Sequence, residues 1–310
     1  MKLVFCGTPQ FAVPSLERLV SAGHDVQLVI TQPDRPQGRG MELAIPAVKQ
    51  SATRLGLRVT QPEKIKNNQE FRLQLEAIRP DAIIVVAYGR IIPGWMLHLP
   101  SHGNINVHAS LLPKYRGAAP IQWAIANGET VTGVTTMKID EGLDTGDILL
   151  KRNVEIHPND TALTLAPRLA ELGADLLVET LAQLEHGSLK PIPQDDSNAT
   201  LAPILKKEDG LIDFNRSARE IHNRLRGFQP WPGAYTRFRG KNLKILEACV
   251  SDRALPLAAG ELCASGNGMV VGCGHASGLE LLQLQPEGKR AMPARDFISG
   301  YHLAAGERLG

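Results

Sequence analysis

Hydrophobic positions in the first part of the chain alternate between short apolar runs and longer stretches with helical spacing. Residues 2–5, 26–31 and 81–87 are apolar runs of strand length, and the apolar residues of 11–22 recur every three or four positions. Strand, helix and strand in this order predict a parallel sheet, because parallel strands need a crossover connection. The run 81–87 is apolar almost throughout, which is typical of a central strand with both faces covered.

Similar patterns continue up to residue 188. Helical spacing recurs at 46–55, 68–78, 121–127 and 161–186, and strand-like runs lie at 57–60, 132–138 and 149–156. The predicted fold class is therefore α/β, with a doubly wound and mostly parallel, Rossmann-like sheet. A single glycine follows the first strand and no G-x-G-x-x-G is present, so a dinucleotide site is poorly supported.

The pattern changes near residue 189. Prolines, aspartates, serine and asparagine gather in 189–206, which predicts a linker. A helix is expected at 218–226, and short β-like runs bounded by glycines follow at 234–238, 243–250, 260–263, 268–273 and 278–285. Short strands at this spacing predict a small, OB-like β-barrel. The expected domains are 1–188 and 207–310, joined by the linker.

Composition narrows the class of protein only a little. The 310 residues are 43% apolar and 21% charged, with a net charge of +2, so a packed core is expected and global charge indicates no partner. No apolar run approaches the roughly 20 residues of a membrane-spanning helix. The four cysteines lack Cys-x-x-Cys spacing, so no metal is predicted. Free thiols without a secretion signal predict a cytoplasmic protein.

Local charge is more informative than net charge. Residues 216–244 hold eight basic residues and one acid, Glu220, with aromatic residues interleaved. Such a surface suits nucleic acid, through phosphate contacts and base stacking, although a solvated basic face is the simpler alternative. Arg35 and Arg39 lie in the long connection 32–42, which is either a solvated surface loop or a basic finger that meets a phosphate backbone.

Asn106 and His108 are the candidate catalytic residues of the first domain. In a strand, residues two apart project from the same face, and Pro113 soon ends this strand. An amide donor and an imidazole could hold a developing oxyanion, and Asp144, on a glycine-containing acidic loop, could relay a proton. These groups suit acyl transfer to a substrate that brings its own nucleophile, such as an amine. The alternative is a polar pair that backbone groups satisfy.

Several motifs together resemble one family. Asn106-x-His108, the following SLLPKYRG, the D-x-G-x-I segment at 144–148 and VVAYG at 85–89 are similar to 10-formyltetrahydrofolate-dependent formyltransferases. FCGTPQFA, TQPDRPQGRG, KKEDGLIDF and GFQPWPGAYT extend the resemblance over essentially the whole chain. Within the family, the chain is most similar to enzymes whose acceptor is methionyl initiator tRNA. The loop departs from the family where lysines are common, since Met41 and Glu42 follow Gly-Arg-Gly here.

The resemblance implies roles for particular residues. The formyl group of 10-formyltetrahydrofolate would pass to the α-amine of the tRNA-bound methionine, with Asn106, His108 and Asp144 as the catalytic residues. The residues that match the folate and pterin contacts are Ser110, Leu111, Leu112, Pro113, Ala87, Tyr88, Gly89, Arg90, Ile139 and Asp140. The loop match and the basic surface together nominate as tRNA contacts Arg35, Arg39, Arg224, Arg237, Arg239 and Lys241.

Other functions share parts of this evidence. A sugar-nucleotide N-formyltransferase would share the first domain and its three catalytic residues, and a formyltetrahydrofolate hydrolase would transfer the group to water. A non-catalytic RNA-binding protein could retain the fold, although the intact set Asn106, His108 and Asp144 speaks against it. Nothing in the sequence demands more than a monomer.

Overall fold

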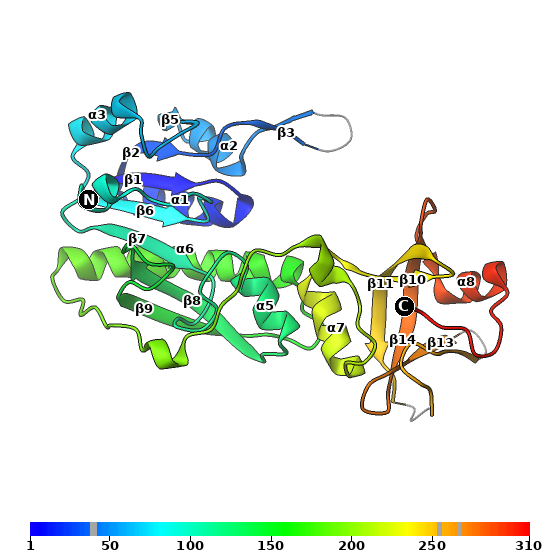
Figure 1. The fold of residues 1–310 in the computed structure, drawn as a ribbon. Coiled ribbons are helices and arrows are strands. Elements are labelled where there is room, and N and C mark those ends of the chain that lie inside the picture. The colour runs from blue at the N-terminus through cyan, green and yellow to red at the C-terminus, as the bar shows by residue number, and fades with distance from the viewer. Residues whose placement is uncertain (38–41, 253–255, 266–267) are drawn as a thin grey trace. The chain divides into compact units, whose positions relative to one another are not determined.

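The computed structural model describes residues 1–37, 42–252, 256–265 and 268–310 (Figure 1). These residues form two compact units. Unit 1 contains Met1–Pro120, Val131–Glu155 and Ala166–Pro203, and unit 2 contains Ile121–Thr130, Ile156–Leu165 and Ile204–Gly310. The units are therefore not contiguous in sequence, because unit 2 takes two segments from the region where the sequence predicts a single domain.

Unit 1 is built on a seven-stranded sheet. Five strands are parallel, and the last two are added antiparallel at one edge. The predicted mostly parallel sheet is thus confirmed. In spatial order the strands are β5 (Val59–Thr60), β2 (Asp25–Ile30), β1 (Lys2–Gly7), β6 (Ala82–Val86), β7 (Asn104–His108), β8 (Val131–Lys138) and β9 (Ile148–Glu155).

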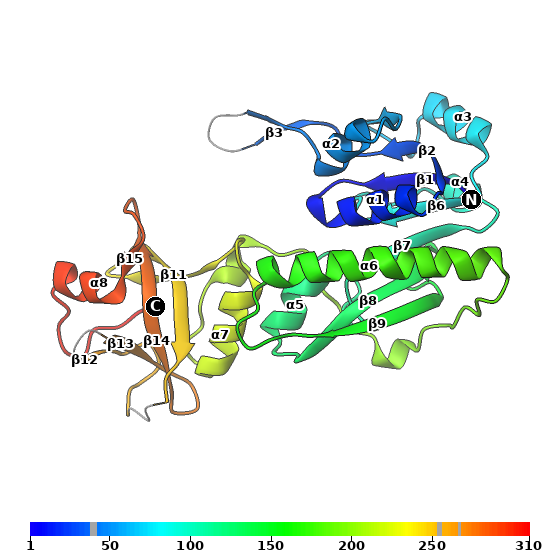
Figure 2. The same ribbon diagram turned by 180° about the vertical axis from the view of Figure 1, so that it is seen from behind.

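Helices cover both faces of this sheet. On one face α1 (Val13–Ser21) and the long α6 (Ala162–Glu185) lie side by side, joined by ion pairs from Arg18 to Glu171 and Asp175 (Figure 2). On the other face α3 (Gln69–Ile78) and α4 (Gly94–Leu97) pack on a core that includes residues of β1, β2 and β6. The short η1 (Gln10–Ala12) precedes α1, and α2 (Ala47–Arg54) packs beside it.

The strand register brings three strand ends together. Gly7 at the end of β1 pairs with Val86, and Val85 of β6 pairs with Asn106 of β7. Because these strands are parallel, the residues that follow them emerge at one edge of the sheet. Ligands of open α/β sheets bind at this edge, so the sheet itself positions a site there.

The connection 32–44 is more ordered than a loop. β3 (Arg35–Gln37) and β4 (Glu42–Ala44) form a two-stranded antiparallel hairpin, which corrects the expectation of an irregular connection. Asp34, at its base, accepts a hydrogen bond from the Lys49 ammonium at 2.6 Å and one from Gln61 at 2.7 Å. Residues 38–41 lie outside the described residues, and the predicted tRNA contact Arg39 is among them.

The segment expected to be a linker is attached to unit 1 over much of its length. Ile192 exchanges two backbone hydrogen bonds with Ile148 of β9, at 2.8 and 2.9 Å. The backbone of Arg116 is bonded to Thr200 and Ala202, at 2.8 and 2.7 Å. The prolines of this segment thus mark irregular backbone, whose hydrogen bonds are made with the start of β9 and with the loop that contains Arg116.

Unit 2 contains an antiparallel sheet that closes on itself. Its strands in order are β10 (Ala234–Phe238), β11 (Lys241–Val250), β14 (Ser277–Pro286), β13 (Gly268–Cys273) and β12 (Leu262–Ser265), with β15 (Met292–Pro293) paired to β14. The last residues join the two edges, since Leu309 pairs with Phe238 and Arg308 with Glu261. This closure agrees with the predicted small barrel.

Two helices flank the barrel sheet. α7 (Ala218–Gly227) begins with a capping box of Ser217 and Glu220, as its Ser-x-x-Glu sequence indicates. α8 (Ala294–Tyr301), which the sequence analysis did not predict, buries Phe297 in the barrel core. Two 3-10 turns, η2 (Asp196–Asn198) and η3 (Lys207–Gly210), complete the described helices.

α7 also holds the two early segments of unit 2. The Arg226 guanidinium donates to the Asp160 carbonyl at 2.7 Å, and Arg224 lies over the rings of Trp123 and Phe228. Trp123 belongs to α5 (Pro120–Ala126), the helix that follows the Asn106–His108 strand and its loop. No helix among the described residues is long and apolar enough to cross a bilayer.

Candidate active site

Asn106 and His108 lie at the carboxyl end of β7. Val107, between them, packs against Gly173 of α6, so the two polar side chains project from the opposite face. Asn106 is half-buried and His108 is only 6% exposed. The alternation predicted from the sequence therefore exists, and it directs both groups into the same space.

The carboxylate of Asp144 lies between these two side chains. Its Oδ1 is 3.4 Å from Asn106 Nδ2, and its Oδ2 is 3.6 Å from His108 Nδ1. The backbone N–H of Gly117 donates to Oδ2 at 2.9 Å. Catalytic contacts are often long without substrate and shorten in the complex. Two side chains of β7 and one of the loop before β9 thus converge.

The hydrogen bond of His108 Nε2 shows which ring nitrogen carries a proton. Nε2 lies 2.9 Å from the carbonyl oxygen of Tyr115. A carbonyl can only accept, so Nε2 must carry a proton and donate. Nδ1 is then the nitrogen that faces Asp144 and the reaction space. The ring orientation is set by backbone, and Tyr115 itself has a left-handed φ of 62°.

The loop Ser110–Pro113 is held from beneath by Thr135 of β8. The Thr135 hydroxyl donates to the Ser110 carbonyl at 2.7 Å and accepts from the Leu112 N–H at 3.1 Å. Ser110 and Leu112 are buried, whereas Leu111 and Pro113 are half-buried. If this loop contacts folate as predicted, the contacts must come from its backbone and from the side chains of Leu111 and Pro113.

The segment Ala87–Arg90 follows β6 beside this loop. Ala87 is exposed and has a φ of 46°, whereas Tyr88 is buried and burial raises the pKa of its phenol. The Gln32 amide donates to the carbonyls of Tyr88 and Gly89, at 3.0 and 3.3 Å. Arg90 donates to the carbonyls of residues 62 and 63. The Tyr88 and Arg90 side chains thus stabilise the strand end, and Ala87 is left to face solvent.

The loop Ile139–Asp144 is organised by its own side chains. Ile139 packs against the hydrophobic core that α3 and α4 form with the sheet. The Asp140 carboxylate accepts from the Gly142 N–H at 3.0 Å and from the Thr145 hydroxyl at 2.8 Å. Asp140 therefore shapes the loop that presents Asp144.

The predicted tRNA contacts differ in their surroundings. Arg35, Arg237 and Lys241 are exposed, and none of the three makes an ion pair with another described residue. Arg239 is paired with Glu307 at 2.6 Å. Arg224 is half-buried and donates to the Asp209 carbonyl at 3.1 Å, and burial lowers the pKa of its guanidinium. Arg224 thus has a packing role of its own.

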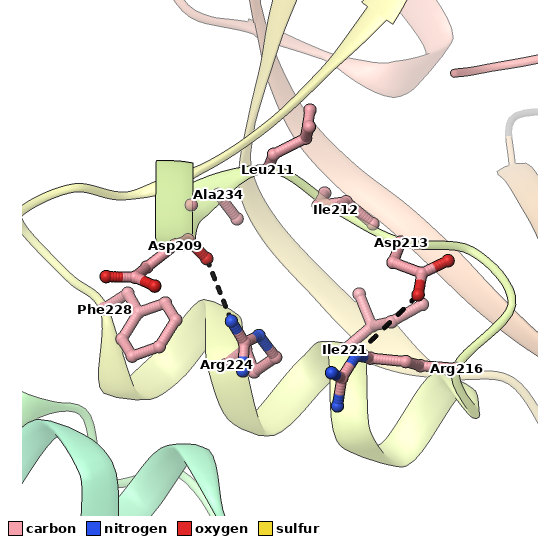
Figure 3. Close-up of a pocket in the computed structure, with 10 residues that line it drawn as sticks. Asp209, Leu211, Ile212, Asp213, Arg216, Ile221, Arg224, Phe228 and Ala234 are labelled. Carbon is pink, nitrogen blue, oxygen red and sulfur yellow. Dashed lines mark hydrogen bonds and ion pairs between the residues drawn. The ribbon is translucent and has the colours of Figure 1, made fainter. Parts of the chain in front are cut away.

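A separate pocket lies in unit 2 and contains none of the three candidate catalytic residues. It is a small hollow between α7 and residues 209–213, in which Arg224 points to Asp209 and Arg216 to Asp213 (Figure 3). Its arginines already have partners in the same hollow, because Arg224 donates to the Asp209 backbone carbonyl and Arg216 lies 4.0 Å from the Asp213 carboxylate. No group of three His, Cys, Asp or Glu side chains in the described parts of the chain is arranged to hold a metal ion.

Three further residues contribute to the site, although the sequence analysis did not predict them: Thr135, Gly117 and Gln194. Thr135 lies in a run with plain strand propensity. Gly117 has a φ of 124°, and a Cβ there would lie 2.6 Å from the Ala202 carbonyl oxygen. Gln194 reaches the Asp144 loop from 50 residues away in sequence. Contacts this distant leave no local periodicity.

Comparison with protein families defines the class. A model of the formyl transferase family matches residues 1–181, and a model of the formyl transferase C-terminal domain matches residues 204–302. The chain therefore belongs to the formyl transferase family.

Similar proteins include curated relatives over the full length. The methionyl-tRNA formyltransferase of Koribacter versatilis (strain Ellin345) is 68% identical over 310 residues, covering 100% of this chain and 99% of the relative. The methionyl-tRNA formyltransferase of Caldanaerobacter subterraneus subsp. tengcongensis is 50% identical over 309 residues, covering 100% of both chains.

Solved structures share the fold at lower identity. WlaRD, a sugar 3N-formyl transferase crystallised in the presence of dTDP and 5-N-formyl-THF, is 20% identical with a TM-score of 0.66, covering 94% of this chain and 99% of that one. HypX from Aquifex aeolicus in complex with tetrahydrofolic acid is 17% identical with a TM-score of 0.60, covering 99% of this chain and 48% of that one.

Proposed function

We propose that this protein transfers the formyl group of 10-formyltetrahydrofolate to the α-amine of methionyl initiator tRNA, giving N-formylmethionyl-tRNA for translation initiation. The observation that carries this proposal is the convergence of the Asn106 amide and the His108 imidazole on the Asp144 carboxylate. Relatives named methionyl-tRNA formyltransferase, 50–68% identical over the whole chain, support this acceptor.

The three side chains match the demands of formyl transfer. The amine nitrogen forms a bond to the formyl carbon, and the bond from that carbon to the folate nitrogen breaks. Negative charge develops on the formyl oxygen during attack, where the Asn106 Nδ2–H and a protonated His108 Nδ1 are the available donors. The ammonium must lose one proton before it attacks, and the same nitrogen loses a second as it becomes the amide. The folate nitrogen gains one proton as it leaves, and the other is released to solvent. Asp144 is suited to pass a proton from the attacking nitrogen to the leaving folate nitrogen.

The edge of the sheet offers a surface that fits a folate. Ala87 is exposed on left-handed backbone, and two apolar side chains of the flanking segments are also exposed, Ile91 at 92% and Leu143 at 62%. Exposed apolar groups beside polar ones are characteristic of ligand sites, and the pterin and benzoyl rings of a folate are flat apolar surfaces with polar edges. Ser110–Pro113, Ala87–Arg90, Ile139 and Asp140 are the residues proposed to hold it.

A tRNA acceptor explains the exposed basic residues. Arg35 on the β3–β4 hairpin and Arg237 and Lys241 on the barrel are proposed to contact phosphates, together with Arg39 and Arg239. Arg239 would have to exchange Glu307 for a phosphate. Arg224 is half-buried, so its proposed effect on tRNA binding is indirect: it would stabilise the surrounding part of unit 2.

The wider assignment follows from this activity. Residues 1–188 are proposed to bind folate and carry out transfer, residues 189–206 to connect the domains, and residues 207–310 to hold the acceptor arm of the tRNA. A protein that formylates initiator tRNA works where translation begins, so we place it in the cytoplasm and expect a monomer.

Substitution of the two donors tests the proposed mechanism. Asn106→Ala and His108→Ala should each lower kcat by roughly 10²–10³, as loss of one oxyanion donor does in other enzymes. His102→Ala, in the turn that precedes β7, serves as the matched control and should retain kcat. Steady-state formylation of methionyl initiator tRNA is the measurement. Unchanged turnover in either donor variant would remove that residue from the mechanism.

A further inference from the structure

Gln194, in the segment that follows α6, contacts the loop that carries Asp144. Its side-chain Nε2 donates to the carbonyl oxygens of Asp144 and Gly146, both at 2.8 Å. One amide thus satisfies two backbone acceptors on either side of Thr145. The segment itself is attached to the sheet by Ile192, two residues earlier, through its paired backbone bonds to Ile148.

The Gln194 amide is in turn oriented by a buried arginine. Arg116 is 7% exposed, and its guanidinium donates to Gln194 Oε1 through Nε at 3.1 Å and through Nη2 at 2.8 Å. Nη2 also donates to Asp196 at 2.7 Å. The oxygen of the amide faces two N–H donors and the nitrogen faces two carbonyls, so only one orientation satisfies every partner.

Arg116 comes from the loop that also serves the other catalytic side chains. The neighbouring Tyr115 carbonyl accepts from His108 Nε2, and the Gly117 N–H donates to the Asp144 carboxylate. Residues 115–117 therefore contact His108 and Asp144 directly through backbone, and contact the Asp144 loop a second time through Gln194.

Asp144 has local reasons to need this support. Its φ is 53°, a left-handed conformation that is unfavourable for a residue with a Cβ, and Glu141, Gly142 and Leu143 before it are exposed. Its carboxylate meets Asn106 and His108 only at 3.4 and 3.6 Å. These contacts, and the bond that Oδ2 accepts from the Gly117 N–H at 2.9 Å, hold the side chain, whereas the two Gln194 bonds hold the backbone on both sides of Thr145.

We propose that Gln194 is a positioning residue for Asp144, and that Arg116 acts through Gln194 to set where the catalytic carboxylate lies. This inference rests on the proposed function, since it concerns the same reaction. Catalytic groups must be held close to the productive geometry, and a displacement of about 1 Å can cost on the order of 10²-fold in rate. The segment expected to be a linker thus serves the active site.

Two substitutions remove the donor and leave the segment in place. Gln194→Met keeps the length of the side chain without hydrogen bonds. Gln194→Glu keeps an oxygen acceptor for Arg116 and replaces only the NH₂ group that faces Asp144 and Gly146. Asn198→Ala is the matched control, because Asn198 is exposed in the same segment and its side chain bonds only to Asp195 among the described residues.

The experiment measures kcat and KM per folded molecule, together with a double-mutant cycle against Asp144→Asn in single-turnover assays. Both Gln194 variants should lower kcat about 10-fold or more, while KM for folate and for tRNA stays within about threefold. If Gln194 acts through Asp144, Gln194→Met should add almost nothing in the Asp144→Asn background. Asn198→Ala should behave as the unsubstituted protein.

Two results would overturn the inference. One is an unchanged kcat in Gln194→Glu, and the other is losses that multiply in the double variant, which would mean that Gln194 acts independently of Asp144. If Gln194→Met fails to fold, Gln194→Glu alone decides through the same cycle. An unsubstituted protein that formylates no tRNA would instead contradict the proposed function, so the two failures are distinguishable.

Discussion

Thr135 offers a demanding test of how the loop Ser110–Pro113 is held. Thr135→Val replaces the hydroxyl by a methyl of similar size, so packing is preserved and only hydrogen bonds are lost. The Leu112 N–H then has no acceptor, and the Ser110 carbonyl loses its donor from β8, both in a buried environment. A buried polar group left unsatisfied costs about 1–3 kcal/mol, so two such groups should lower the free energy of unfolding by about 2–6 kcal/mol.

Thr135→Ser is the matched control for this prediction. It keeps the hydroxyl and removes one buried methyl, which is worth roughly 1 kcal/mol. Urea unfolding followed by far-UV circular dichroism gives the free energy of unfolding, and the KM for the formyl donor reports on the loop. We expect Thr135→Val to be clearly less stable than Thr135→Ser and to have a raised donor KM. If the two variants agree within about 0.5 kcal/mol, the hydroxyl does not hold the loop.

Two further predictions concern charge. Hydrogen bonds from Lys49 and then from Gln61 lower the pKa of the Asp34 carboxyl below its usual 3.8, so its contribution to stability is present above that pH and is lost as pH falls through the lower folded value. The difference in urea midpoint between the unsubstituted protein and Lys49→Met should therefore shrink on acidification from pH 7 to pH 3, and a constant difference would contradict the assignment. Arg237→Ala with Lys241→Ala should weaken tRNA binding and flatten its dependence on salt, because fewer counterions are released, with folate KM unchanged. Identical salt slopes in a binding titration would exclude phosphate contacts by these two residues.

The sequence was a good guide wherever structure depends on neighbours in the chain. The apolar run 81–87 contains β6, and the Asn106-x-His108 alternation corresponds to two side chains on one face of β7. Both follow from strand geometry, in which side chains alternate and buried strands lack polar positions. Because β6 and β7 are parallel and Val85 pairs with Asn106, residues 87–90 follow β6 at the edge of the sheet where His108 ends β7.

The sequence was a poor guide wherever structure depends on distant partners. The prolines and polar residues of 189–206 indicated a linker, yet Gln194 and Thr200 find acceptors and donors in loops about 50 and 85 residues away. The β3–β4 hairpin contains Pro36, which weakens any strand prediction. α8 contains Gly300 and begins after Pro293 without a side-chain cap, so its start signal is weak.

One formylation assay tests the central claim most directly. Methionyl initiator tRNA and methionyl elongator tRNA are offered side by side with 10-formyltetrahydrofolate, and N-formylmethionine and tetrahydrofolate are quantified, with an amino-sugar nucleotide and water as the other acceptors. The account predicts efficient formylation of the initiator tRNA, equal amounts of the two products, and loss of the activity in Asn106→Ala. Formylation of the amino sugar instead, or formate released without any acceptor, would contradict it.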